Sequence, residues 1–196
     1  MNKLNLPNKL TLARIIMVPI CMLFILLGPA PLPDTWSRII SAAVFILTSL
    51  TDMLDGMIAR SRGLVTDFGK LMDPLADKML VLGVLLALIV RFRGDTLFCL
   101  VLMIVTFIVL LRELAVTSLR LVVASKESVV VAANWMGKAK TVTQILTILV
   151  LLLEPIVLPA SAPILSYVCL VLMTLLTIAS GMSYFKAYWP SIDPTK

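Results

Sequence analysis

The chain has 196 residues, of which 60% are apolar, and it carries 17 basic and 11 acidic side chains but no histidine. Its mean hydropathy of +1.06 excludes an ordinary soluble domain and indicates a membrane protein. The lack of histidine excludes histidine-based triads, histidine metal sites and imidazole bases, so any general base is expected to be a carboxylate. The net charge of +6 suits an anionic lipid surface, and no motif points to a nucleic-acid partner.

Six apolar segments follow one another, and proline and glycine mark several of their ends. A membrane-spanning helix takes about 20 mostly apolar residues, a length that only the last segment provides without interruption. The second, third and fifth are apolar in one half and polar in the other, so their polar halves are expected to share a hydrated cavity open to one side. A single all-α polytopic domain over residues 1–196 fits this pattern. The expected segments are 10–28, 37–60, 73–91, 96–124, 138–154 and 162–185.

The basic residues are distributed unevenly over the connections between these segments. If the N-terminus is cytoplasmic, 14 of the 17 basic residues lie on that side, leaving only Arg38, Arg91 and Arg93 for the other. The positive-inside rule therefore predicts that both termini and the polar cavity face the cytoplasm. The N-terminal apolar stretch has no small-residue cleavage site, so no signal peptide is expected, which suits a bacterial plasma membrane.

Five of the eleven acids fall within residues 52–77, which read DMLDGMIARSRGLVTDFGKLMDPLAD. Asp52 and Asp55 are three residues apart, and Asp73 and Asp77 are four apart, so each pair shares a helix face. The stretch 61–69 is expected to connect the two helices and let them lie side by side. Carboxylates near a bilayer rarely occur without paired charges, metals or a water-filled cavity. Four converging oxygen ligands suit Mg²⁺ or Mn²⁺.

Each acid taken alone has a simpler interpretation. Asp73 precedes Pro74, so it could be a helix N-cap followed by proline at the first helical position. Asp67, in the expected loop, would be solvated or a local cap, and Asp52 and Asp55 could be ordinary interfacial acids. The joint spacing of the acids favours a shared site.

This joint pattern resembles the signature of the CDP-alcohol phosphotransferases. All eight fixed positions are filled, in the order Asp52-x-x-Asp55-Gly56-x-x-Ala59-Arg60, eight residues, Gly69, three residues, Asp73, three residues, Asp77. The resemblance implies six transmembrane helices behind a short N-terminal amphipathic segment, usually as a homodimer. It also implies transfer of a phosphatidyl-type group from a CDP-linked donor to an alcohol, with release of CMP.

The resemblance implies a role for each acid. Asp52, Asp55 and Asp73 would hold two divalent cations, Mg²⁺ or Mn²⁺. Asp77 would approach a metal and deprotonate the attacking hydroxyl. The CDP-linked donor would be bound by Asp52, Gly56, Ala59, Arg60, Thr66, Asp67 and Gly69.

Some donor residues have alternative explanations. The small Gly56 and Ala59 would admit the cytidine, although small residues also mark helix contacts in membranes. Arg60 would hold a donor phosphate, or it could be an anchor that obeys the charge bias. Gly69 is expected to be a turn glycine.

Two later clusters bear on the acceptor: Arg112-Glu113, and Gly137-Lys138-x-Lys140-Thr141-x-x-Gln144. The lysines stand near an expected helix N-terminus, where backbone N–H groups favour anions. Arg112, Lys138, Lys140 and Thr141 are therefore candidates to bind an acceptor phosphate. Alternatively, the lysines reflect charge bias, and Arg112 with Glu113 forms a structural ion pair.

The stretch Gly137–Gln144 and the opening Leu6-Pro7-Asn8-Lys9-Leu10-Thr11-x-x-Arg14 resemble the phosphatidylglycerophosphate synthase branch of this family. That branch joins CDP-diacylglycerol to sn-glycerol 3-phosphate. Within the family, inositol phosphate or serine would be an alternative acceptor. From a different class, the acids could form the pathway of a small cation- or proton-coupled transporter.

Overall fold

The computed structural model describes residues 5–27, 32–61, 66–126, 135–159 and 163–189, without the side chains of 6–7, 52–61, 67, 70 and 124–126. The described residues form six α-helices. They are α1 Leu6–Leu26, α2 Asp34–Ser61, α3 Asp67–Arg91, α4 Thr96–Lys126, α5 Trp135–Val157 and α6 Ile164–Tyr188.

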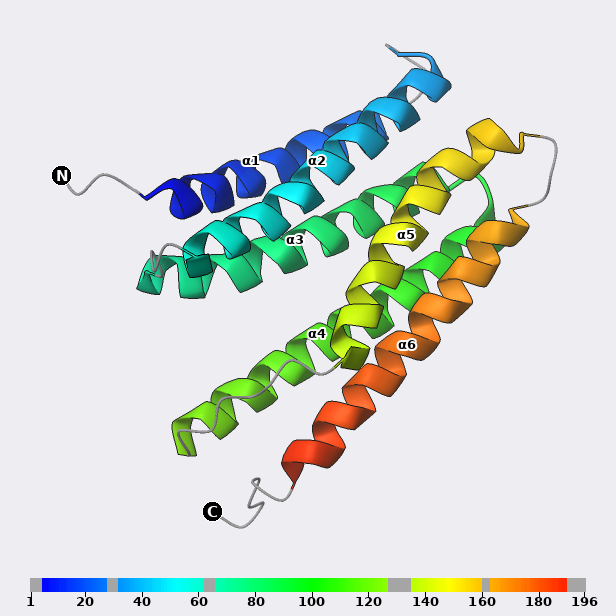
Figure 1. Cartoon of the computed structure of the whole chain (residues 1–196). Coiled ribbons are helices and arrows are strands. Elements are labelled where there is room, and N and C mark those ends of the chain that lie inside the picture. Colours follow the sequence, from blue (N-terminus) through cyan, green and yellow to red (C-terminus); the bar gives the residue numbers. More distant parts are fainter. Residues whose placement is uncertain (1–4, 28–31, 62–65, 127–134, 160–162, 190–196) are drawn as a thin grey trace.

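The helices form two groups of three, with α1, α2 and α3 on one side and α4, α5 and α6 on the other (Figure 1). In the first group α1 packs on both α2 and α3, and in the second α6 packs on both α4 and α5. Contacts of α3 with α4 and of α2 with α5 join the groups around an apolar core. Toward the beginning of α3 and the ends of α4 and α6, the two groups diverge (Figure 1).

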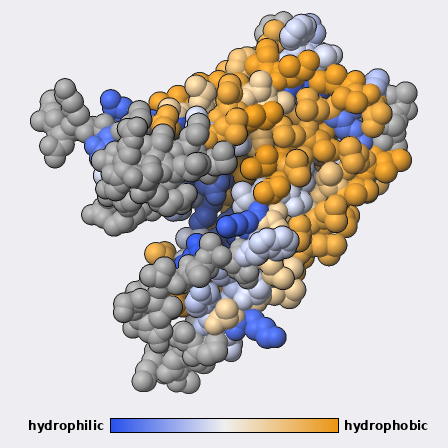
Figure 2. Space-filling model, viewed as in Figure 1, coloured by the Kyte–Doolittle hydropathy of each residue, from blue (hydrophilic) through white to orange (hydrophobic). Residues whose placement is uncertain are grey.

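Within the described residues, four helical stretches are long and apolar enough to cross a membrane: Asn8–Leu26, Thr96–Val123, Trp135–Val157 and Ile164–Tyr188. The expectation that only the last segment would span without interruption is therefore wrong. Large apolar side chains such as Phe107 and Leu175 are exposed, and much of the visible surface is hydrophobic (Figure 2). Because such a surface needs an apolar solvent, the helices and this surface together define a polytopic membrane protein.

The amphipathic segment expected at the N-terminus is not a separate element within the described residues. Residues from Leu6 onward belong to α1, a continuous 21-residue helix with proline in its first turn. Proline is tolerated there because its missing N–H would have no partner inside the helix. Asn8 and Thr11 therefore lie on the same continuous helix as the apolar residues that follow.

The third helix begins earlier than expected. Thr66 is its N-cap, with its Oγ1 accepting a hydrogen bond from the Gly69 N–H at 3.1 Å. Asp67 is consequently the first residue of α3 and not part of the connecting loop. The interpretation of Asp73 as an N-cap is wrong, since Asp73 and Pro74 both lie inside the helix. The helix begins directly after Thr66 because an N-cap side chain satisfies backbone N–H donors that have no partner inside the helix.

At the opposite end of the bundle, charged side chains hold the helices together. The buried Glu154 of α5 accepts hydrogen bonds from the backbone N–H groups of Leu165 and Ser166, at 2.9 and 2.8 Å, and from the Ser166 hydroxyl. Pro163, the residue at the N-cap position of α6, makes no such side-chain bond, so a neighbouring helix supplies the cap.

Candidate active site

The acids of the motif lie on two helices joined by a short connection. Asp52 and Asp55 belong to the last turns of α2, and Asp73 and Asp77 lie one turn apart near the start of α3. In Figure 1 the end of α2 and the start of α3 lie together at one end of the first group. Six predicted site residues have side chains that lie outside the described part of the structure. They are Asp52, Asp55, Gly56, Ala59, Arg60 and Asp67.

The first helix holds the start of α3 in place through two hydrogen bonds between polar side chains. Thr11 Oγ1 donates to Asp73 Oδ1 at 2.6 Å, and Thr66 Oγ1 donates to Asn8 Oδ1 at 2.9 Å. Thr11 and Asn8 are three residues apart and therefore share one face of α1. Asp73 is thus oriented by a helix that is about 60 residues distant in sequence.

Gly69 is not the turn glycine that the sequence suggested, because it lies in the first turn of α3 and is buried. A Cβ on this residue would lie 3.2 Å from Asn8 Oδ1, 3.3 Å from Thr66 Oγ1 and 3.7 Å from Asp73 Oδ2. The glycine therefore permits a close approach between α1 and the start of α3, and three side-chain oxygen atoms lie around it.

This donor set fits a hard divalent cation, which prefers carboxylate, amide and hydroxyl oxygens over nitrogen or sulfur. Among the residues with described side chains no group of three or more acids, cysteines or histidines forms a metal cluster. The predicted ligand set needs Asp52 and Asp55 for completion, and these side chains are outside that part of the structure. Of the four predicted ligands, the side chains of Asp73 and Asp77 are described.

A cavity of about 940 Å³ opens beside Asp77, between the start of α3, the last turns of α4, the start of α5 and the end of α6. Figure 2 shows hydrophilic residues in the hollow between the two diverging groups. The described lining has five cationic side chains against two carboxylates. The cations are Lys78, Arg112, Arg120, Lys138 and Lys140, and the acids are Asp77 and Glu113.

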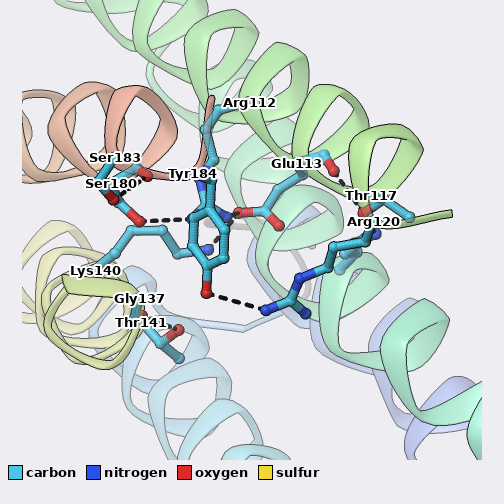
Figure 3. Close-up of polar contacts among 11 residues, drawn as sticks. Arg112, Glu113, Thr117, Arg120, Gly137, Lys140, Thr141, Ser180, Ser183 and Tyr184 are labelled. Atoms are coloured by element: carbon cyan, nitrogen blue, oxygen red, sulfur yellow. Dashed lines mark hydrogen bonds and ion pairs between the residues drawn. The ribbon is translucent and has the colours of Figure 1, made fainter. Parts of the chain in front are cut away.

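Glu113 organises the cations of this cavity. Its Oε1 lies 3.1 Å from Arg112 Nη1 and is also bonded by Lys140 Nζ, so one carboxylate joins α4 to α5 (Figure 3). Arg112 Nη2 additionally donates to Ser180 Oγ of α6 at 2.6 Å. The structural ion pair that the sequence left open is therefore present, and it lies within the cavity wall. The ammonium group of Lys140 is therefore already paired with the Glu113 carboxylate.

Tyr184 of α6 stands between two arginines of α4, as Figure 3 shows. Its hydroxyl accepts a hydrogen bond from Arg120 Nη2 at 3.0 Å, and the guanidinium carbons of Arg112 and Arg120 lie 5.6 and 5.1 Å from its ring centre. Such contacts orient cations without neutralising them. Lys78 of α3 donates to Thr117 of α4, which further ties the two groups together.

The structure therefore brings Asp77 to the same cavity as Arg112, Lys138, Lys140 and Thr141. It places Thr66, Gly69 and Asp73 in the neighbouring contact with α1. The sequence interpretation missed Lys78, Arg120 and Tyr184 as lining residues. Arg120 lies eight residues after Arg112, about two helical turns, which is a spacing that could have identified it. Tyr184 carried no such signal, because its place depends on how α6 packs against α4.

The chain belongs to the CDP-alcohol phosphatidyltransferase family, whose pattern it matches over residues 4–180. Among its curated relatives is a CDP-diacylglycerol–glycerol-3-phosphate 3-phosphatidyltransferase of Bacillus subtilis, 38% identical, with 96% of this chain and 97% of that one covered. A Rickettsia bellii protein of the same name is 38% identical, covering 93% and 94%. One from Pseudomonas fluorescens is 32% identical, covering 96% and 92%.

Proposed function

We propose that this protein transfers the phosphatidyl group of CDP-diacylglycerol to sn-glycerol 3-phosphate, giving phosphatidylglycerol phosphate and CMP. The observation that carries the proposal is the cavity beside Asp77, whose described lining has three more cationic than anionic side chains. An acceptor with its own phosphate dianion matches this surplus, whereas serine brings no such charge. The names of the relatives favour glycerol 3-phosphate over inositol phosphate.

In the proposed reaction the acceptor phosphate binds among Arg112, Lys138, Lys140 and Thr141. Lys138 and Lys140 belong to the first turns of α5, where free backbone N–H groups add to their attraction for an anion. With the phosphate fixed there, the primary hydroxyl of the acceptor can reach Asp77 on the α3 side of the same cavity. Holding the two reactants in this geometry lowers the entropic part of the barrier.

Asp77 is the proposed general base. It takes the proton of the primary hydroxyl, whose oxygen forms a bond to the lipid-side phosphorus while the bond from that phosphorus to the CMP oxygen breaks. CMP leaves with the electron pair of the broken bond. Asp77 suits this role because it lines the cavity and its side chain is exposed.

Asp52, Asp55, Asp73 and Asp77 are the proposed ligands of two divalent cations, either Mg²⁺ or Mn²⁺. When bound, such cations would neutralise the donor pyrophosphate and stabilise the charge that develops on CMP. Asp52, Gly56, Ala59, Arg60, Thr66, Asp67 and Gly69 are the proposed donor-binding residues. The oxygen atoms of Asn8, Thr66 and Asp73 around Gly69 support the placement of this subsite beside Asp73.

We further propose that the cavity and both termini face the cytoplasm of a bacterial plasma membrane and that the protein is a homodimer. The charge bias supports the orientation, since the cavity and most basic residues would then lie on one side. The resemblance to the family supports the dimer. Family membership disfavours the alternative of a cation- or proton-coupled transporter.

The direct test is release of CMP by the purified protein in detergent with CDP-diacylglycerol and Mg²⁺. Parallel reactions would contain sn-glycerol 3-phosphate, inositol phosphate or serine, and labelled acceptor would be followed into the lipid fraction. Release with glycerol 3-phosphate alone is the expected result. Release only with another acceptor would keep the family chemistry and overturn the proposed acceptor. No release with any of them would contradict the proposal as a whole.

A further inference from the structure

The cavity has an inner extension that the proposed phosphate site does not use. A small hollow of about 10 Å³ adjoins the main cavity and shares Asp77, Lys78, Glu113 and Lys140 with its wall. Gln144 of α5 also lines this hollow. It lies four residues after Lys140, so the two side chains share a face of the helix.

Gln144 is an unusual residue in this position, because its amide is buried but incompletely bonded. The residue is 2% exposed, and its Nε2 has no hydrogen-bond partner among the residues that the structure describes. A buried polar group without a partner costs about 1–3 kcal/mol, so it is normally satisfied by water or by a ligand. The nearby volume of about 10 Å³ has the size of one water molecule or one hydroxyl group.

We infer that Gln144 binds the secondary hydroxyl of the acceptor and thereby selects a 1,2-diol monophosphate. The inference rests on the proposed function and adds a third contact to it. The cations at the start of α5 hold the phosphate, Asp77 receives the primary hydroxyl, and Gln144 lines the small hollow that shares Asp77 and Lys140 with the cavity. An amide is suited to this task because it can donate to a hydroxyl oxygen and accept from a hydroxyl proton.

Three separate contacts on one small molecule also distinguish its mirror images. With the phosphate and the reacting hydroxyl fixed, the secondary hydroxyl of sn-glycerol 3-phosphate points to one side of the carbon chain, and that of sn-glycerol 1-phosphate points to the other. A single amide on one wall can therefore bond only one enantiomer. Gln144 becomes a specificity-determining residue both for the presence of the hydroxyl and for its configuration.

The test compares sn-glycerol 3-phosphate with 3-hydroxypropyl phosphate, which lacks only the secondary hydroxyl. The wild-type protein should show a kcat/KM about tenfold higher for glycerol 3-phosphate, since the analogue leaves the buried amide unpaired. Gln144→Met keeps the length of the side chain but removes both polar atoms. In this variant the preference should fall to within about twofold, and the preference over sn-glycerol 1-phosphate should fall with it.

Two variants keep the experiment decisive. Gln144→Asn retains an amide one carbon further back and should show an intermediate preference, even if Gln144→Met folds poorly. Thr143→Val is the matched control on the same helix, because the Thr143 hydroxyl bonds the carbonyl of Ala139 at 2.9 Å within α5. This control should leave both preferences unchanged.

The contrary results are separable from failure of the proposed function. If Gln144→Met slows both acceptors equally and the preference stays about tenfold, Gln144 only packs the bundle or holds a water molecule, and the inference is overturned. A wild-type protein that uses both acceptors equally well would also overturn it. A wild-type protein that uses neither, while active on another alcohol, would instead reject the proposed acceptor and the inference with it.

Discussion

Both ends of the helix bundle contain charged side chains, but these side chains make different contacts at the two ends. At one end Asp34 bonds Arg38 at 2.7 Å and also Arg91, and Glu154 is fully engaged in capping α6. At the other end the charges surround a cavity of about 940 Å³ with a surplus of cations. Buried donors there, the Arg112 Nε and the Gln144 Nε2, have no partner within the described part of the chain.

The charges at the first end therefore hold helices together, whereas those at the second line a cavity that a ligand could enter. A polar group whose hydrogen bonds are all made within the protein stabilises the packing and has no capacity left to bind a ligand. A group that keeps unused hydrogen-bonding capacity beside a cavity can bind something that enters. Charge content alone would not have distinguished the two ends. The difference is that the charges at one end bond to one another and to a helix start, whereas those at the other end surround an open cavity.

The largest expected effect on turnover comes from Asp77→Asn at the cavity end. The amide cannot accept the proton of the acceptor hydroxyl, so kcat should fall by about 10²–10⁴-fold. CMP release measures this loss, and calorimetric titration with CDP should show that nucleotide binding is kept. Asp34→Asn is the matched variant at the opposite end and should keep normal kcat. Normal turnover in Asp77→Asn would remove Asp77 as the base.

Lys140→Met should act mainly on acceptor binding. Loss of a charged hydrogen-bond donor from the phosphate site should raise the KM for glycerol 3-phosphate by about tenfold to a hundredfold, with a smaller change in kcat. Initial rates at varied acceptor concentration measure it. Lys186→Met, which replaces an exposed lysine at the end of α6, is the control and should leave this KM unchanged. Equal KM values in the two variants would place Lys140 outside the acceptor site.

Thr11→Val should weaken divalent metal binding without removing a metal ligand. The Thr11 hydroxyl orients Asp73 through a bond of 2.6 Å, and its loss should lower the affinity for Mn²⁺ by about three- to tenfold. Electron paramagnetic resonance of free Mn²⁺ measures the affinity without turnover. Thr11→Ser keeps the hydroxyl and should restore it. If the valine and serine variants bind Mn²⁺ equally well, the bond to Asp73 has no role in positioning.

Glu154→Ala should have the smallest effect on catalysis and a clear effect on stability. It leaves the N–H groups of Leu165 and Ser166 without their acceptor, which should cost about 2–4 kcal/mol. Thermal unfolding in detergent should therefore shift downward by several degrees, while kcat and the acceptor KM stay normal. Glu154→Gln keeps one acceptor oxygen and should lose less. A large change in acceptor KM would show that the two ends are coupled.

Much of the architecture could be predicted from the sequence because it depends on local patterns. Apolar runs and their proline and glycine ends indicated six helices, and the spacing of Asp73 and Asp77 placed them on one face. The start of α3 was mispredicted because the sequence Asp73-Pro74 resembles a helix start more than Thr66 does. Thr66 is also bonded to Asn8 of α1, a contact between helices distant in sequence that no local pattern indicates.

The candidate site was predictable only in part for the same reason. Its acids and lysines lie in compact motifs, but its remaining wall comes from packing between helices distant in sequence. Tyr184 meets Arg120 across 64 residues, and Glu113 meets Lys140 across 27. No pattern within either segment specifies these pairs. The role of Gly69 was also hidden, since its need for a small side chain arises from Asn8 on α1.

The assignment of the cavity as the active site can be tested directly by a structure of the protein with Mn²⁺ and sn-glycerol 3-phosphate, with anomalous scattering used to locate the metal. Manganese is expected beside Asp73 and Asp77, with the acceptor phosphate at Lys138 and Lys140 and the primary hydroxyl directed toward Asp77. Manganese away from these acids, or a phosphate bound outside this cavity, would contradict the assignment of the cavity as the active site.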